Sequence, residues 1–168
     1  MKMIRILLTC LTLAFQPAWA DDNNVSAFPA RVTGTVLSAA VKDGALVTLR
    51  VGNRRIRVEI ANTPQSREHG LMQRNFLCED CGMLFVFEKA DKYSFWMKDT
   101  LIPLSIAFVT PDGIVTNIEE MLPLTTDPHN SDGDVLYALE MNAGWFSKNN
   151  ISPNDKVQGI KPAQSSIP

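Results

Sequence analysis

The sequence predicts a mainly β fold, a small β-barrel or jelly-roll-like sandwich that carries one short helix. Three observations predict it. Short apolar or alternating segments recur along the chain, turn signals rich in Gly, Pro and Asp separate them, and only one segment carries a strong helix-start signal. Many short strands between regularly spaced turns are typical of β-barrels and sandwiches. We therefore expect a single β-rich domain over residues 31–160.

The start of the chain is typical of a secretory signal peptide. Lys2 and Arg5 precede an uncharged apolar stretch from Ile6 to Phe15, and Ala18-Trp19-Ala20 supplies the small residues of a cleavage site. The apolar stretch is shorter than the roughly 20 residues that span a bilayer. We expect a signal peptide over residues 1–20, cleavage near Ala20, and a periplasmic or secreted protein without a remaining membrane span.

Removal of this segment changes the charge of the protein. The full chain has 168 residues with 16 basic and 18 acidic side chains. Loss of Lys2 and Arg5 leaves 14 basic side chains in 148 residues and a net charge of −4. This acidic balance argues against nucleic acid as a partner, because surfaces that bind nucleic acids are basic. We expect a monomer with a loose segment at 21–30 and a flexible tail at 161–168.

The first half of the domain is predicted to form a hairpin-rich region. Strands are expected over Arg31 to Val41 and Ala45 to Val51, separated by the turn signal Asp43-Gly44. Arg54 to Ala61 alternates with period two after a turn at Gly52-Asn53. One face of this last strand is apolar (Ile56, Val58, Ile60) and the other is charged (Arg55, Arg57, Glu59). The arginines could form an anion site, but we favour a solvated hairpin face.

One helix is predicted after these strands. Thr63 is a candidate N-cap and Pro64 suits the first helical position. We expect the helix to extend to about Arg74, with Leu71 and Met72 on its buried side. Gly70 within this span costs about 1 kcal/mol relative to Ala. It indicates either an earlier end of the helix or the close approach of another element.

The second half of the domain is predicted to be β-rich again. Turn signals include Pro111-Asp112-Gly113 and Ser152 to Asp155, and Leu122 to Asp134 is expected to be a polar loop. Ala143 to Phe146 is expected to open a helical turn. The expected strands are Met83 to Phe87, Tyr93 to Met97, Leu104 to Val109, Ile114 to Met121, Tyr137 to Met141 and Lys156 to Ile160.

Four motifs in a fixed order give the chain a family resemblance. They are Gly70 to Arg74 (GLMQR), Gly82 to Phe87 (GMLFVF), Phe95 to Leu104 (FWMKDT followed by IPL) and Leu139 to Phe146 (LEMNAGWF). Over about Arg57 to Gly159 the chain resembles the uncharacterised domain-of-unknown-function family number 192. The resemblance implies a small, mostly β, barrel-like or jelly-roll domain with one helix, often preceded by a signal peptide. It implies no activity.

The chain departs from that family pattern at three positions. Ser66 stands before Arg67 where the family usually has Glu, and Asp99 replaces an Asn after WMK. Ser105 stands where the family has Asp after IPL. A mechanism that needs this last acid is therefore in doubt for this chain.

Cys78 and Cys81 enclose two acidic residues, Glu79 and Asp80. In an oxidising compartment, two cysteines at this spacing are expected to form a local disulfide. A reactive pair favours a helix N-terminus or nearby cations, whereas this pair follows the helix and has acidic neighbours. We favour a structural disulfide over a catalytic redox pair and over a metal site.

Metal binding has little support in the sequence. The two histidines, His69 and His129, and the cysteine pair match no zinc spacing. Met72, Met83 and Met97 lie near His69 in sequence, and thioethers suit Cu(I). Methionine at apolar positions is ordinarily core filler. We assign no metal and no cofactor, and retain copper handling only as an alternative.

A candidate ligand surface combines the helix with the FWMKDT motif. Arg67 and Arg74 are seven residues apart and would share one helix face. Strand alternation separates Phe95, Met97 and Asp99 from Trp96, Lys98 and Thr100, and one set should face the core. An aromatic wall with a few fixed polar groups holds small polar ligands. The candidate ligand-binding residues are Arg67, Arg74, Trp96, Lys98, Asp99 and Thr100.

The same residues can also be explained without a ligand. Arg67 and Arg74 could pair with Glu68 or Asp99 in a structural network, and Trp96 could belong to the core. The favoured hypothesis is a non-enzymatic binding or accessory module for a small polar ligand, glycan or envelope partner. The alternatives are an envelope enzyme acting on carbohydrate or peptide and a thiol redox or copper-handling protein. An enzyme would need converging carboxyl groups, for example from Glu119, Glu120 and Glu140.

Overall fold

The computed structural model describes residues 41–160. The predicted signal peptide, the segment at 21–30 and the tail at 161–168 lie outside the described residues. So does the strand predicted over Arg31 to Val41, apart from Val41, which lies in a bend. In the described part, no helix is long and apolar enough to cross a membrane.

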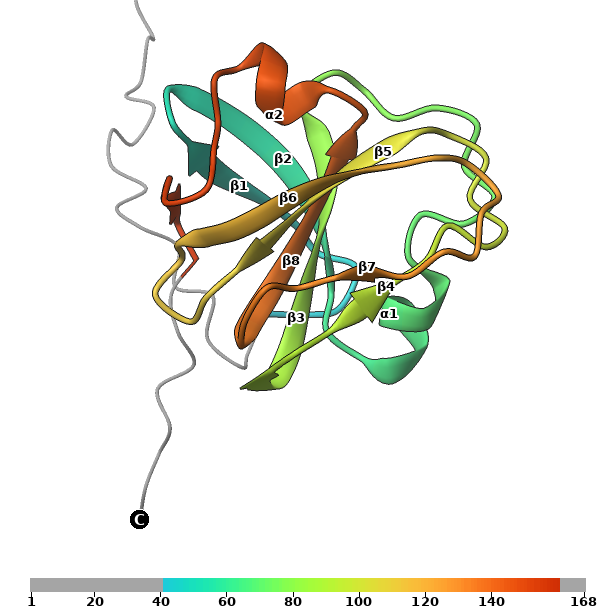
Figure 1. Cartoon of the computed structure of the whole chain (residues 1–168), viewed down its shortest axis with the longest axis horizontal. Helices are drawn as coiled ribbons and strands as arrows, with labels where there is room; N and C mark the ends of the chain where they lie inside the picture. The colour runs from blue at the N-terminus through green and yellow to red at the C-terminus, as the bar shows by residue number, and fades with distance from the viewer. Residues whose placement is uncertain (1–40, 161–168) are drawn as a thin grey trace, which may run out of the picture. The chain divides into compact units, whose positions relative to one another are not determined.

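A curled seven-stranded sheet forms a half-barrel and confirms the mainly β class (Figure 1). Its strand order is β6-β5-β8-β3-β2-β1-β9, and β4 and β7 form a separate two-stranded sheet. Figure 1 shows this small sheet beside helix α1. The strands are β1 (Leu46–Val51), β2 (Arg54–Ala61), β3 (Cys81–Asp91), β4 (Ser94–Phe95), β5 (Leu104–Val109), β6 (Val115–Met121), β7 (His129–Asn130), β8 (Val135–Asn142) and β9 (Val157–Gln158).

The strand pattern follows from burial on the two faces of the sheet. β2 spans the predicted range, and its alternation places Ile56, Val58 and Ile60 in the core, at most 1 % exposed. Arg55 and Arg57 are exposed, as the hairpin interpretation expects. All six residues of β5 are buried, because β6 and β8 flank this strand and both of its faces are covered.

Helix α1 (Pro64–His69) is shorter than predicted. Its N-terminus is as expected: Thr63 and Ser66 form a reciprocal capping box, and Pro64 stands at the start. The helix ends at Gly70, whose φ of 50° breaks the helical path. No residue of α1 is buried, and Leu71 enters the core only after the helix. The prediction of a helix to Arg74 was therefore wrong, whereas the early end suspected from Gly70 is confirmed.

Two further predictions need correction. The expected strand over Tyr93 to Met97 contains only β4, and the expected polar loop Leu122 to Asp134 contains its partner strand β7. Backbone hydrogen bonds explain the difference, because Met97 N–H donates to Thr125 and Leu124 N–H to Thr100. These loop contacts take the place of a longer run of strand pairing between the two segments. A second short helix, α2 (Trp145–Lys148), forms where a helical turn was expected.

Two apolar clusters pack on opposite faces of the sheet. The larger cluster contains Ile56, Leu139 and Trp145. The second contains Met83, Phe85, Ile106 and Phe108 on the face that α1 and β4 cover. The candidate site lies on this second face.

Candidate functional site

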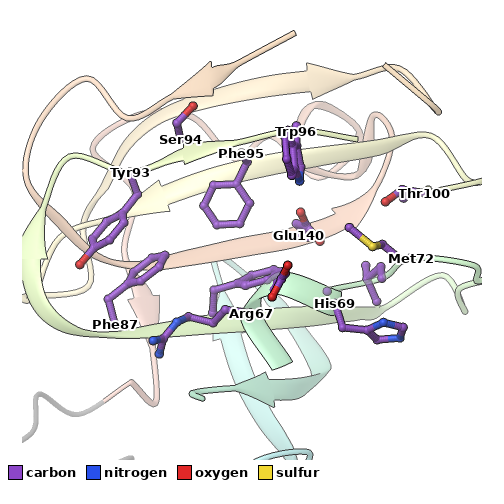
Figure 2. Close-up of a pocket in the computed structure, with 14 residues that line it drawn as sticks. Arg67, His69, Met72, Phe87, Tyr93, Ser94, Phe95, Trp96, Thr100 and Glu140 are labelled. Carbon is purple, nitrogen blue, oxygen red and sulfur yellow. The ribbon is translucent and has the colours of Figure 1, made fainter. Parts of the chain in front are cut away.

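A pocket of about 320 Å³ opens between α1, its following turn, β3, β4 and β8. Figure 2 shows aromatic side chains around it, with the carboxyl group of Glu140 between Phe95, Trp96 and Met72. The lining residues are Arg67, Glu68, His69, Gly70, Leu71, Met72, Phe85, Phe87, Tyr93, Ser94, Phe95, Trp96, Thr100 and Glu140. The wall combines aromatic and aliphatic side chains with several polar ones, including Glu68, His69, Ser94 and Thr100.

Glu140 is the polar group at the floor of this pocket. Strand β8 places it opposite Met83 on β3 and Ile106 on β5, so two apolar residues flank it across the sheet. The residue is only 4 % exposed. Burial alone raises the pKa of its carboxyl to about 8, and no hydrogen bond to another described residue opposes that shift. Glu140 is therefore a neutral acid at pH 7, with one O–H donor and free acceptor positions.

Aromatic rings from β3 and the β4 segment build the wall. Phe85 and Phe95 pack edge to face with centroids 4.9 Å apart, and Phe87 stacks on Tyr93 at 3.5 Å. Trp96 is 52 % exposed at the rim, and its nitrogen-bearing edge turns toward the pocket in Figure 2. A rigid aromatic wall with an exposed indole offers a flat apolar surface beside an N–H donor.

Arg67 borders the pocket but is held by the protein. Its guanidinium donates to the carbonyls of Asn62 and Val86 and pairs with Glu88 at 2.7 Å. It also lies 5.6 Å from the ring centroid of Phe87. Its side chain is only 14 % exposed. Arg67 therefore fixes α1 against β3.

The six candidate residues are only partly brought together. Arg67, Trp96 and Thr100 line the pocket, whereas Arg74, Lys98 and Asp99 do not. Arg74 lies beyond the end of α1, so the expectation that it shares a helix face with Arg67 was wrong. Its guanidinium forms a bidentate ion pair with Glu59, with both hydrogen bonds at 2.5 Å. The arginine partners are thus Glu88 and Glu59, not Glu68 or Asp99.

Side chains of the FWMKDT segment alternate between buried and exposed positions over only part of its length. Met97 is buried, Trp96 is exposed, and the Lys98 Nζ lies 5.7 Å from the Trp96 ring centroid. At Asp99 the backbone turns to a φ of 56°, and the alternation ends. Thr100 is then only 5 % exposed and lines the pocket.

The other candidate carboxyl groups have separate surroundings. Glu119 contacts His129 Nδ1 at 2.7 Å, whereas Glu120 accepts from the buried Ser105 hydroxyl at 2.7 Å. Glu140 shares neither partner. Adjacent residues on β6 thus point to opposite faces, and these three acids do not form one cluster.

The cysteine pair lies away from the pocket. Cys78 and Cys81 are joined in a disulfide, with Cα atoms 5.1 Å apart. Among residues 41–160, no three His, Cys, Asp or Glu side chains gather in a group that could hold a metal ion. Met83 and Met97 are buried in the core, while Met72 lines the pocket with His69.

Sequence reasoning named Glu140 but did not place it in the site. The available signal was a single Glu between Leu139 and Met141 in an otherwise apolar strand. Such a position predicts a buried charge that needs a partner or a function. The aromatic residues of β3 looked like ordinary core residues, because an apolar pattern in a strand does not show whether the side chains pack in a filled core or line a pocket.

The fold and these motifs define the class of protein. A family model for the uncharacterised domain-of-unknown-function family 192 (DUF192), described as "Uncharacterized ACR", matches residues 47–159. The chain belongs to this family.

Two solved structures share the fold at substantial identity. One, from Sinorhizobium meliloti 1021 and described as a "putative transcription regulator", is 34 % identical; the match covers 67 % of this chain and 92 % of that chain, with a TM-score of 0.64. The other, a protein of unknown function from Novosphingobium aromaticivorans DSM 12444, is 36 % identical over 67 % of this chain and 84 % of that chain, with a TM-score of 0.64. No curated protein matches the chain.

Proposed function

We propose that this protein is an exported, monomeric binding module whose pocket holds a small, uncharged, polar ligand with a flat apolar face, such as a sugar ring. The observation that carries the proposal is the Glu140 carboxyl, which is buried, unpartnered among residues 41–160 and open to an aromatic pocket. Burying a polar group without a partner is unfavourable. A ligand hydroxyl or amide would supply that partner.

Of the acidic and basic side chains that line the pocket, Glu68 and His69 are exposed, and the two least exposed, Arg67 and Glu140, favour an uncharged ligand. Arg67 is paired with Glu88 and hydrogen-bonded to two carbonyls, so its charge is already balanced. Glu140 is neutral at pH 7, because its pKa is about 8. A ring could stack on Trp96 while its polar edge meets Glu140. Aromatic walls with a few fixed polar groups are a common way of holding such ligands.

Ligand binding can be tested with a panel of neutral monosaccharides and their N-acetyl derivatives. The readouts are thermal shift and tryptophan fluorescence, since Trp96 is exposed and Trp145 is buried. We expect at least one sugar to raise the apparent stability, as any ligand of the native state does. Trp96→Ala and Glu140→Leu, which removes the polar group, should weaken that binding about tenfold or more, whereas Leu46→Ala, an exposed apolar control outside the pocket lining, should not.

The pH profile separates this proposal from its main competitor. A neutral ligand that accepts a hydrogen bond from the protonated Glu140 carboxyl should lose affinity above about pH 8, when the carboxyl ionises. A cationic amine should instead gain affinity there. Absence of binding across the panel, or binding that ignores both pocket substitutions, would remove the proposal.

Export is a separate part of the proposal and rests on the first 20 residues. The full chain can be expressed in a Gram-negative host and the periplasmic fraction analysed by intact mass. We expect a mature protein that begins at Asp21. An uncleaved chain in the cytoplasm would contradict export but would leave the pocket proposal standing.

A further inference from the structure

An arginine from the neighbouring strand lies over the Cys78–Cys81 pair. Arg57 on β2 is the register partner of Cys81 on β3, and its Nη2 donates to both sulfur atoms at 3.8 Å. In the described part of the chain, no carboxylate lies within ion-pair distance of Arg57. Its charge is therefore directed at the two sulfurs.

The acidic residues between the cysteines are bound elsewhere. Glu79 pairs with Lys148 on α2 at 2.6 Å, and Asp80 pairs with Arg54 on β2 at 2.6 Å. Asp80 also accepts from the indole nitrogen of Trp145 at 3.0 Å. Hydrogen bonding to Arg54 holds the pKa of Asp80 below its usual range. Partner cations thus balance both carboxylates, and the remaining charge beside the sulfurs is positive.

We propose that the Cys78–Cys81 pair is a thiol–disulfide exchange site that oxidises dithiols in protein substrates. A cation beside a cysteine stabilises its thiolate, and a sulfur that forms a stable thiolate leaves faster in exchange. Cys81 opens β3 and packs against the apolar cluster, whereas Cys78 lies in the preceding loop. This places Cys78 as the sulfur that a substrate attacks and Cys81 as the leaving sulfur.

The atoms and electrons of the exchange balance with only two reactants, the substrate dithiol and the Cys78–Cys81 disulfide. A substrate thiolate attacks Cys78 Sγ, the intramolecular S–S bond breaks, and its electron pair leaves on Cys81 Sγ beneath Arg57. The second substrate thiolate then attacks the substrate sulfur of the mixed disulfide and expels Cys78. Two electrons and two protons pass from the substrate to the pair, so one dithiol becomes a disulfide and the cysteines become thiols.

The first test is an equilibrium titration of the full chain in glutathione redox buffers, with Cys10→Ser so that Cys78 and Cys81 are the only thiols. Alkylation and intact mass count the reduced cysteines. We expect reduction within the glutathione range. Arg57→Ala should lower the equilibrium constant for reduction about tenfold, because the thiolate loses the neighbouring positive charge. Arg57→Lys keeps a positive charge and should lower the constant less.

Arg55→Ala is the matched control, since Arg55 lies two residues away on the same exposed strand face and touches neither sulfur. It should leave the equilibrium constant unchanged. A pair that resists millimolar glutathione in the Cys10→Ser chain overturns the proposal, and this result does not depend on how the Arg57 variants fold. Equal constants for Arg57→Ala and Arg55→Ala would also overturn it.

A trapping experiment tests the order of attack. In the Cys81→Ser chain, Cys78 should form a stable mixed disulfide with a dithiol peptide that has been activated as its thionitrobenzoate derivative. In Cys78→Ser, Cys81 should react at least about tenfold more slowly, because it packs against the core. Equal or reversed rates would refute the assignment of Cys78 as the attacked sulfur. None of these results depends on the pocket ligand.

Discussion

Glu140 on β8 stands directly opposite Met83 on β3, so the register of the sheet fixes a carboxyl group within an apolar face. In the folded state, burial raises the pKa of this carboxyl from 4.5 to about 8. Between these pH values the folded chain holds a proton that the unfolded chain has lost. Stability should therefore fall as pH rises through this window, by up to about 1.4 kcal/mol per pH unit.

Glu140→Gln should remove this pH dependence, because an amide keeps the shape and cannot ionise. The measurement is the urea midpoint at pH 5 and pH 7.5 for both proteins. We expect the variant to be the more stable one at pH 7.5. Glu68→Gln, at an exposed position of the same pocket, should retain the slope of the unsubstituted protein. Parallel slopes for the unsubstituted and Glu140→Gln proteins would contradict a neutral Glu140.

Arg67→Ala should destabilise the fold by about 2–3 kcal/mol. The side chain is nearly buried, and its removal leaves the Val86 and Asn62 carbonyls without their donor. Chemical denaturation measures the change. Glu88→Gln should cost less than about 1 kcal/mol, because Glu88 is 69 % exposed and exposed ion pairs contribute little. Similar losses for both variants would mean that the ion pair, not the buried carbonyls, explains the role of Arg67.

Gly82→Ala should destabilise the protein by about 3 kcal/mol. A Cβ at Gly82 would lie 2.2 Å from the Glu140 carbonyl oxygen and 2.5 Å from Met141 Sδ, so the β3–β8 pair would have to move apart. Gly133→Ala is the control, since nothing lies within 4 Å of its Cβ position. Thermal unfolding compares the two. A tolerated Gly82→Ala would show that these central strands separate easily, against the close packing that shapes the pocket floor.

The sequence was sufficient for the elements whose signals are local. β2 was predicted at its observed bounds because Ile56, Val58 and Ile60 alternate with charged residues. The start of α1 followed from Thr63 and Pro64. β4 and β7 were harder, because two residues of pairing carry no periodic signal and depend on loop contacts made elsewhere.

The sites depended on contacts between distant residues. Arg57 lies 21 residues before Cys78, and only the parallel pairing of β2 with β3 brings the two together. Glu140 reaches the same pocket as Arg67 through the β3–β8 register. Composition and spacing identified acids, arginines and cysteines, but which charges balance one another is a property of the sheet order.

Ser105→Asp should destabilise the protein by about 2 kcal/mol at pH 7. Ser105 is fully buried, and its hydroxyl lies 2.7 Å from both carboxylate oxygens of Glu120, its cross-strand partner on β6. The Gly144 N–H donates to both side chains. A carboxylate at position 105 would lie next to that of Glu120, and two adjacent negative charges at a buried site repel each other. The penalty should shrink at acidic pH, because protonation of the introduced carboxylate removes the repulsion. Ser105→Asp combined with Glu120→Ser restores a single carboxylate on the opposite strand and should recover most of the loss, as measured by urea denaturation in a double-mutant cycle. Additive losses in that cycle would show that the side chains at positions 105 and 120 do not interact.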